Sequence, residues 1–100
     1  MDRERQVIDK IKQVLDKVGH DLIGYRVVLF GSRACGAARE RSDFDIGILG
    51  PQKLALRAFY RIYDLLDEID TLYSIDLVDM SDVSESFRSE ALLKTEVLYG

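Results

Sequence analysis

Three aspartates in this 100-residue sequence are spaced so that they could hold divalent metal ions. Asp43 and Asp45 lie two residues apart, and Asp76 interrupts an apolar run over residues 75–78. Residues two apart on a strand point to the same side, so the first two carboxylates would lie roughly 6–7 Å apart along the chain. Such anions repel each other unless a cation lies between them, and magnesium prefers hard oxygen ligands. The spacing therefore predicts a metal site of the kind that binds a phosphorylated substrate.

Each of these acids also has a structural interpretation. Asp43 taken alone would be a turn or capping residue. Asp45 and Asp76 are different, because both fall inside apolar strands, where an unpaired buried carboxylate is costly and a cation is a favourable partner. Asp79 has the opposite strand parity, so we expect it to face away from Asp76 or to lie at the entry to a helix.

A Gly-Ser turn precedes the acids. Gly31 follows an apolar run and permits close backbone approach, while Ser32 adds a hydroxyl donor beside the amides of the next turn. Such a pair alone is typical of an ordinary turn, but with the downstream acids it predicts a site for phosphate and metal together. Arg33 is expected to contact nucleotide phosphates. Arg39 and Arg41 fit that role and a solvated loop equally well.

The remaining pattern predicts the elements that position these residues. Helical spacing covers residues 7–18 and about 53–70, and strands are expected at 27–30, 43–49 and 73–78. A last helix is expected to begin at Ser81 or Asp82 and to carry apolar residues as far as Leu98. This order predicts an α/β domain with a three-stranded sheet covered by helices. The spacing leaves the relative direction of the first two strands open.

Composition excludes several classes of protein. The formal net charge is −4 and the pI is near 4.9, which argues against a free-standing nucleic-acid binder. Hydrophobic residues make up 47% of the chain, enough for one core and against disorder. Cys35 is the only cysteine, so no intramolecular disulfide is possible. No apolar run reaches membrane-spanning length and the start is charged, so we expect one domain over residues 1–100, in the cytoplasm.

The sequence resembles the signature of polymerase-beta-type nucleotidyltransferases at residues 29–34, 42–46 and 75–78. The length of the chain is similar to that of the minimal nucleotidyltransferases, or MNT proteins. The resemblance implies a small nucleotidyltransferase fold with a mixed sheet and about four helices, with ATP as substrate and two magnesium ions. It assigns phosphate binding to Gly31 and Ser32. Asp43 and Asp45 would ligate both metals, and Asp76 would ligate the catalytic one.

The same resemblance implies a protein partner. MNT proteins are commonly the antitoxin half of a pair with a HEPN ribonuclease toxin, and members transfer AMP to a tyrosine of that partner. Larger relatives close their site with an extra helical domain, so here the acceptor protein or a second copy of the chain would cover the nucleotide. Tyr60 and Tyr99 are the candidates for partner contact. Neutralisation by occlusion alone, and transfer to a small molecule, are the alternatives.

Overall fold

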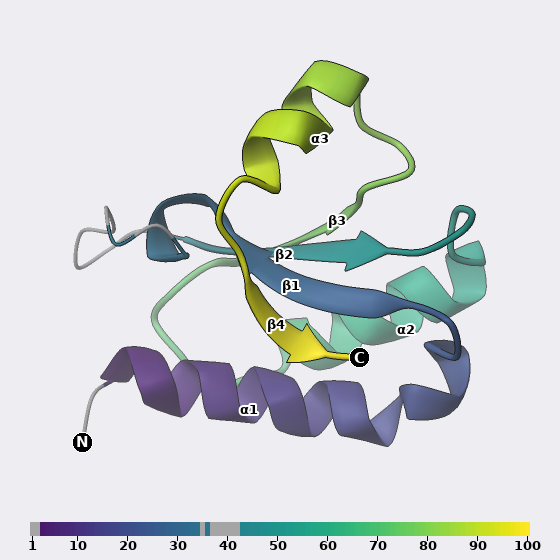
Figure 1. Ribbon diagram of the computed structural model, residues 1–100. Helices are drawn as coiled ribbons and strands as arrows, with labels where there is room; N and C mark the ends of the chain where they lie inside the picture. The colour runs from purple at the N-terminus through teal and green to yellow at the C-terminus, as the bar shows by residue number, and fades with distance from the viewer. Residues whose placement is uncertain (1–2, 35, 37–42) are drawn as a thin grey trace.

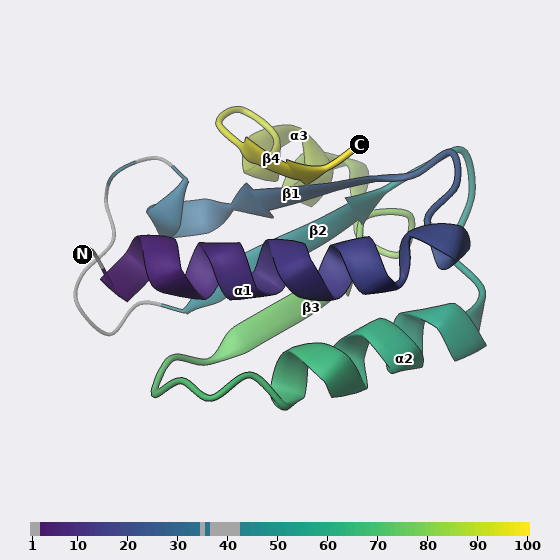
Figure 2. The same cartoon turned by 90° about the horizontal axis from the view of Figure 1, so that it is seen from below.

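The computed structural model describes residues 3–34, 36 and 43–100, and its central feature is a β-sheet with helices on both faces (Figures 1 and 2). Along this described part the elements are α1 (Arg3–Lys17), the 3-10 turn η1 (Gly19–Asp21), β1 (Arg26–Phe30), the 3-10 turn η2 (Gly31–Arg33), β2 (Phe44–Leu49), α2 (Leu56–Asp67), β3 (Ile75–Asp79), α3 (Glu85–Ala91) and β4 (Glu96–Tyr99). The sheet order is β3-β2-β1-β4. β1 runs antiparallel to β2 and β4, and β2 runs parallel to β3, so the sheet is mixed as the resemblance implied.

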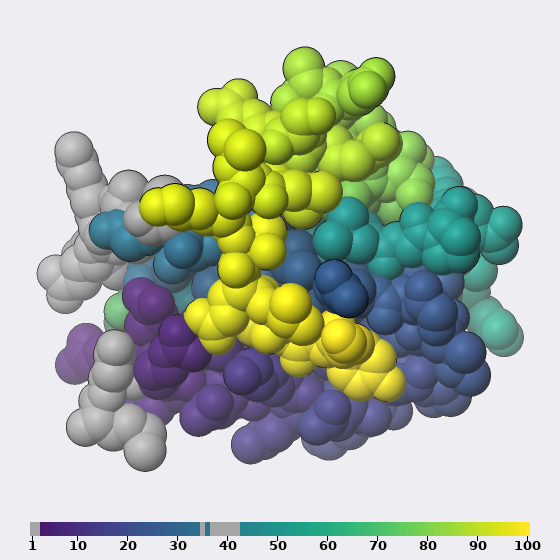
Figure 3. Space-filling view, in the orientation of Figure 1, coloured from purple at the N-terminus to yellow at the C-terminus, as the bar shows by residue number. Residues whose placement is uncertain are grey.

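The two faces of the sheet are covered unequally. Helices α1 and α2 lie side by side over one face, and the short α3 lies over the other (Figure 2). Beneath α1 and α2, the alternate β2 residues Phe44, Ile46 and Ile48 are fully buried, as their spacing predicted. Burying each such side chain stabilises the fold by about 1.5–3 kcal/mol. On the opposite face, α3 and the segment after it form a ridge that projects from the sheet (Figure 3).

The last helix is shorter than expected, and a fourth strand replaces its second half. Helix α3 ends at Ala91, and β4 pairs with β1 through Val97 opposite Val28. The expectation of three strands was therefore wrong, because the outer edge of β1 presents backbone groups that another strand can satisfy. Leu98 is buried in the core from this strand rather than from a helix. In place of about four helices, the described residues form three α-helices and two 3-10 turns.

A bidentate ion pair ties the new strand to the first helix. The two guanidinium nitrogens Nη1 and Nη2 of Arg5 donate to the two carboxylate oxygens of Glu96, each at 2.7 Å. The hydrogen bond from Arg5 lowers the pKa of Glu96 more than its partial burial raises it. Tyr99, from the same strand, is half-buried and packs against the core, so it is a poor candidate for partner contact. Tyr60 is 55% exposed.

Asp79 organises the chain at the end of β3. It lies on the α1 and α2 side of the sheet, away from Asp76, as its strand parity predicted. Its Oδ2 accepts a hydrogen bond from the amide of Leu54 at 2.9 Å, and its Oδ1 accepts one from Ser81 at 2.9 Å. The following helix is capped by Ser84, whose Oγ accepts from the Phe87 amide, and not by the two residues expected from the sequence.

Among the helices of the described residues, none combines the length and the apolar character that crossing a bilayer requires.

We predict that Asp79→Ala lowers the free energy of unfolding by about 2–4 kcal/mol, because the amides of Leu54 and Ser81, in two different loops, lose the carboxylate that accepts their hydrogen bonds. Urea denaturation measures the change. The control is Asp82→Ala, which removes an exposed carboxylate whose partner Lys53 lies 3.3 Å away. That exposed pair contributes at most about 1 kcal/mol. Equal losses in the two variants would contradict the role of Asp79.

Candidate active site

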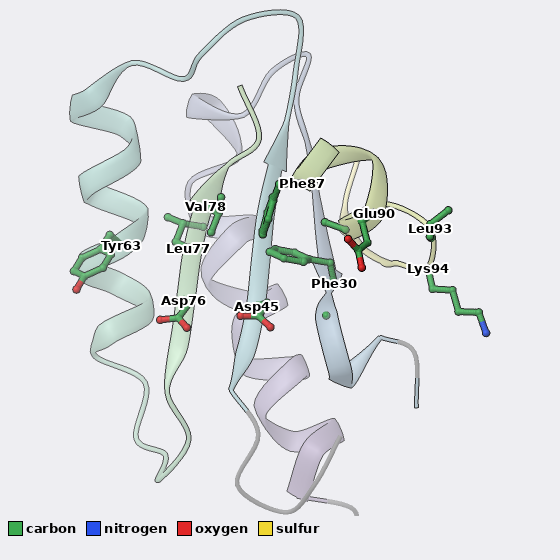
Figure 4. A pocket seen from close by; sticks show the side chains of 12 residues that line it. Phe30, Asp45, Tyr63, Asp76, Leu77, Val78, Phe87, Glu90, Leu93 and Lys94 are labelled. Carbon is green, nitrogen blue, oxygen red and sulfur yellow. The ribbon is translucent and has the colours of Figure 1, made fainter. Parts of the chain in front are cut away.

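Two of the three predicted metal ligands face each other across neighbouring strands. Asp45 on β2 and Asp76 on β3 are partners in the parallel register, so strand alternation sends both side chains to the face that carries α3. Figure 4 shows the two carboxylates side by side above the sheet. Asp43 is exposed and lies just before β2. The structure therefore brings Asp45 and Asp76 together, whereas Asp43 lines a different hollow beside the start of α1.

The electrostatics of Asp45 reflect this arrangement. Its pKa is raised, first by partial burial, then by the negative charge of Asp76 and finally by that of Asp43. All three effects disfavour the carboxylate form, and a divalent cation would oppose all of them. The part of the chain that the structure describes contains no group of three acidic, histidine or cysteine side chains already spaced for a metal ion. A facing carboxylate pair nevertheless fits magnesium, which commonly takes one or two carboxylates and completes its shell with substrate phosphate oxygens.

Gly31 lies directly against Asp45. Its φ is +75°, a conformation that favours glycine, and a Cβ placed there would collide with Oδ2 of Asp45. Both the backbone angle and the lack of a side chain are therefore required. Ser32 follows in the same 3-10 turn and is half-buried. The predicted Gly-Ser bend thus lies against one of the predicted acids, Asp45.

Arg33 lies elsewhere. Its guanidinium is 3.0 Å from Oε2 of Glu4 and stacks over the rings of Phe44 and Tyr73, at 4.3 and 4.8 Å from their centroids. Phe44 precedes Asp45 in β2 and so points to the opposite face of the sheet. The structure does not bring Arg33 to the acids, because the three-residue turn directs its side chain under the sheet, where it joins α1 to the core. Cys35, Arg39 and Arg41 lie outside the described residues.

A cleft of about 970 Å³ stands over the carboxylate pair. Its floor is formed by the strands and one wall by α3 and the residues after it, including Phe87, Glu90 and Lys94. Tyr63 of α2 lines it beyond Asp76. Glu90 and Lys94 could not be predicted from the sequence as lining residues, since their place depends on how α3 packs. Phe87 is 45% exposed and stacks edge-on against Phe30.

Comparison with known proteins identifies relatives of this arrangement. The family model for the polymerase beta nucleotidyltransferases matches residues 9–100. A chain of a toxin–antitoxin complex crystallised with AMP-PNP aligns with a TM-score of 0.63 at 26% identity, over 89% of this chain and 73% of that one. A chain assigned as a minimal nucleotidyltransferase gives a TM-score of 0.62 at 26% identity, over 96% and 95% of the two chains.

A third solved structure shares the fold at lower identity. It holds a tri-AMPylated HEPN toxin of Shewanella oneidensis in complex with an MNT antitoxin. The alignment has a TM-score of 0.61 at 21% identity and covers 93% of this chain and 72% of that one. No curated protein matches the sequence.

We predict that Asp45→Asn raises the melting temperature when no divalent cation is present, because it removes a carboxylate whose charge the fold disfavours. A raised pKa means that the folded state binds the proton more tightly than the unfolded state. Protonation of Asp45 therefore stabilises the folded wild-type protein at low pH, and this contribution to the free energy of unfolding is lost as pH rises above about 4.

Melting temperatures measured between pH 4 and 8 in the presence of a chelator test this prediction. The difference in melting temperature between Asp45→Asn and the wild type should be largest at neutral pH and should vanish in acid. Magnesium should reduce this difference by stabilising the wild type. Asp16→Asn, which neutralises an exposed acid on α1, is the control. A variant less stable than the wild type at pH 7 in chelator would contradict the conclusion that the fold disfavours the Asp45 carboxylate.

Proposed function

This chain belongs to the polymerase beta nucleotidyltransferase family, and we propose that it transfers AMP from ATP to a hydroxyl group of a protein partner. The observation that carries the proposal is the in-register pair of Asp45 and Asp76 beside the Gly31 bend, on the floor of an open cleft. The relative crystallised with AMP-PNP supports ATP as the nucleotide.

Different residues of the site are proposed to bind the phosphates and the metal ions. Gly31 and Ser32 are proposed to hold the triphosphate, because the backbone of Gly31 lies directly against Asp45 and the Ser32 hydroxyl follows in the same turn. Asp43, Asp45 and Asp76 are the proposed ligands for two magnesium ions. When bound, magnesium neutralises phosphate charge and lowers the pKa of the acceptor hydroxyl.

The transfer step follows from these positions. The acceptor oxygen forms a bond to the α-phosphorus while the bond from that phosphorus to the bridging oxygen breaks, and pyrophosphate leaves. If the acceptor is a tyrosine, its pKa near 10 exceeds that of a free aspartate by about six units. A free carboxylate is therefore a poor base for this hydroxyl unless a bound cation lowers the pKa of the hydroxyl. Because its side chain is exposed, Asp76 can position the hydroxyl and pass the proton to water.

The proposed partner is a HEPN-type toxin, and the chain would act as its antitoxin. The relatives at 26% identity include a chain of a toxin–antitoxin complex. The cleft supports this partner, since its open side gives a protein hydroxyl access to Asp76. Neutralisation of the partner by occlusion alone would use the same complex without transfer.

The decisive experiment incubates the protein with magnesium, each nucleoside triphosphate in turn and the product of the adjacent reading frame, and then measures intact masses. We expect an AMP adduct on the partner with ATP. Asp43→Asn, Asp45→Asn and Asp76→Asn should abolish the adduct and leave the fold intact, while Asp16→Asn should not. A tight complex without any adduct would instead establish occlusion, and an adduct retained by Asp45→Asn would contradict the proposed site.

A pair of glycine variants isolates the close approach at Gly31. Gly31 and Gly36 both have positive φ, at +75° and +77°, so an alanine at either position costs about 1 kcal/mol of backbone strain. Only at Gly31 would the added methyl group meet Asp45, since Gly36 has nothing within 4 Å. We therefore expect Gly31→Ala to lose the thermal stabilisation by magnesium and AMP-PNP, and Gly36→Ala to keep it. Equal ligand responses would contradict the role of the bend.

A further inference from the structure

The order of the site residues across the sheet gives the reaction a direction. Gly31 follows β1, Asp45 lies on β2 and Asp76 lies on β3, which is an edge strand. If Gly31 holds the phosphates, as the proposed function requires, pyrophosphate leaves toward β1. In-line displacement needs the incoming oxygen on the opposite side of the phosphorus. The acceptor must therefore enter over the edge formed by β3.

A hollow in the surface lies at the β3 edge of the sheet. This hollow of about 430 Å³ lies between the end of α2, the loop after it and the start of β3. It shares Tyr63 and Asp76 with the cleft, so the two spaces adjoin at the proposed catalytic acid. Figure 4 shows Tyr63, Asp76, Asp45 and Phe30 in that order across the molecule. An acceptor side chain can thus reach Asp76 from the side away from Gly31.

Large apolar side chains surround this entrance and are exposed. Tyr60 and Tyr63 on α2 are 55% and 44% exposed, and their rings make an edge-to-face contact. Leu72, in the loop that lines the hollow, is 100% exposed. Isolated exposed apolar residues are ordinary, but a group beside a functional cleft is typical of a protein-binding surface, where tyrosine is enriched.

The charge at this edge selects the kind of partner. Residues 62–87 contain eight acidic residues and no lysine or arginine. Four of the acidic residues are exposed at the end of α2 and in the loop after it: Asp64, Asp67, Glu68 and Asp70. They outnumber Lys10 of α1, whose Nζ reaches this loop and donates to the Asp70 carbonyl at 3.4 Å. Such a surface repels nucleic acids and anionic membranes and favours a basic protein surface.

We propose that Tyr60, Tyr63, Asp67, Glu68 and Leu72, here called the α2–β3 surface, dock the protein that presents the acceptor hydroxyl. The occupant is a protein whose facing surface is basic around an apolar centre. This inference rests on the proposed function for the position of the acceptor. The position of the docking surface itself is inferred from three observations: the exposed apolar side chains, their continuity with the cleft and the acidic residues around them.

The first test removes an apolar contact. Leu72→Ala truncates a fully exposed side chain, so the fold should be unaffected, while the dissociation constant for the product of the adjacent reading frame should rise about tenfold. Ile23→Ala is the matched control, because it truncates another exposed aliphatic residue, at 81%, away from this surface. Isothermal titration calorimetry measures both constants. Equal affinities for the two variants would overturn the apolar half of the proposal.

The second test reverses charge without weakening the helix. Asp67→Lys with Glu68→Lys places cations at the C-terminal end of α2, where the helix dipole favours them, so loss of folding is not expected. Association with the same partner should slow about tenfold at low ionic strength, and the loss should shrink in high salt. The control, Asp9→Lys with Asp16→Lys, makes the same change in net charge on exposed positions of α1. If the control slows association as much, only the overall charge matters and the surface assignment fails.

Measuring binding and AMP transfer in parallel separates this inference from the proposed function. If the wild type binds the partner but forms no adduct, the proposed function fails, and the variant affinities still decide where docking occurs. If transfer proceeds and neither test pair weakens binding or transfer relative to its control, the proposed function stands and the α2–β3 surface is wrong.

Discussion

The structure depends on holding two like charges beside each other on adjacent strands. Asp45 and Asp76 face each other only because β2 and β3 run parallel in a register that pairs them. A shift of one residue would send one carboxylate into the core beneath the sheet. The raised pKa of Asp45 reflects its partial burial first and then the repulsion from Asp76, and the folded protein tolerates both because the rest of the sheet is firmly anchored. The site is therefore less favourable for stability than a neutral surface and better suited to binding a cation.

That anchoring comes from the unequal use of the two faces of the sheet. Helices α1 and α2 bury most of one face, including all of its β1 and β2 side chains in the core, which leaves the other face free to carry polar groups and a cleft. On this second face, glycine occurs at positions beneath the cleft where a side chain would not fit. A side chain at Gly47 would collide with Met80 and crowd Phe30, just as one at Gly31 would collide with Asp45. The floor of the cleft thus consists of backbone, two carboxylates and a few apolar side chains.

Local alternation made part of this arrangement predictable, and distant packing decided the rest. The period of two in β2 placed Asp45 opposite the buried Phe44 and its alternate neighbours, and the break in the apolar run marked Asp76. Neither Arg33 nor β4 could be placed in this way. A three-residue turn redirects the arginine, and the last strand is set by the open edge of β1, more than sixty residues earlier in the chain. The cleft wall escaped prediction for the same reason, because Lys94 gains its position only through the packing of α3.

The cleft has one fixed wall and one open side, and this difference connects recognition to chemistry. On the fixed side, α3 is held by Nε of Arg88, which donates to the carbonyl of Met80 at 2.8 Å, and by the contact between Phe87 and Phe30. On the open side, beyond Asp76, exposed tyrosines and acids stand where a second wall would be. A nucleotide bound here would stay open to water until a protein covers it. A partner that docks on the open side would exclude that water and deliver its hydroxyl in the same step, so transfer would be confined to the protein that fits.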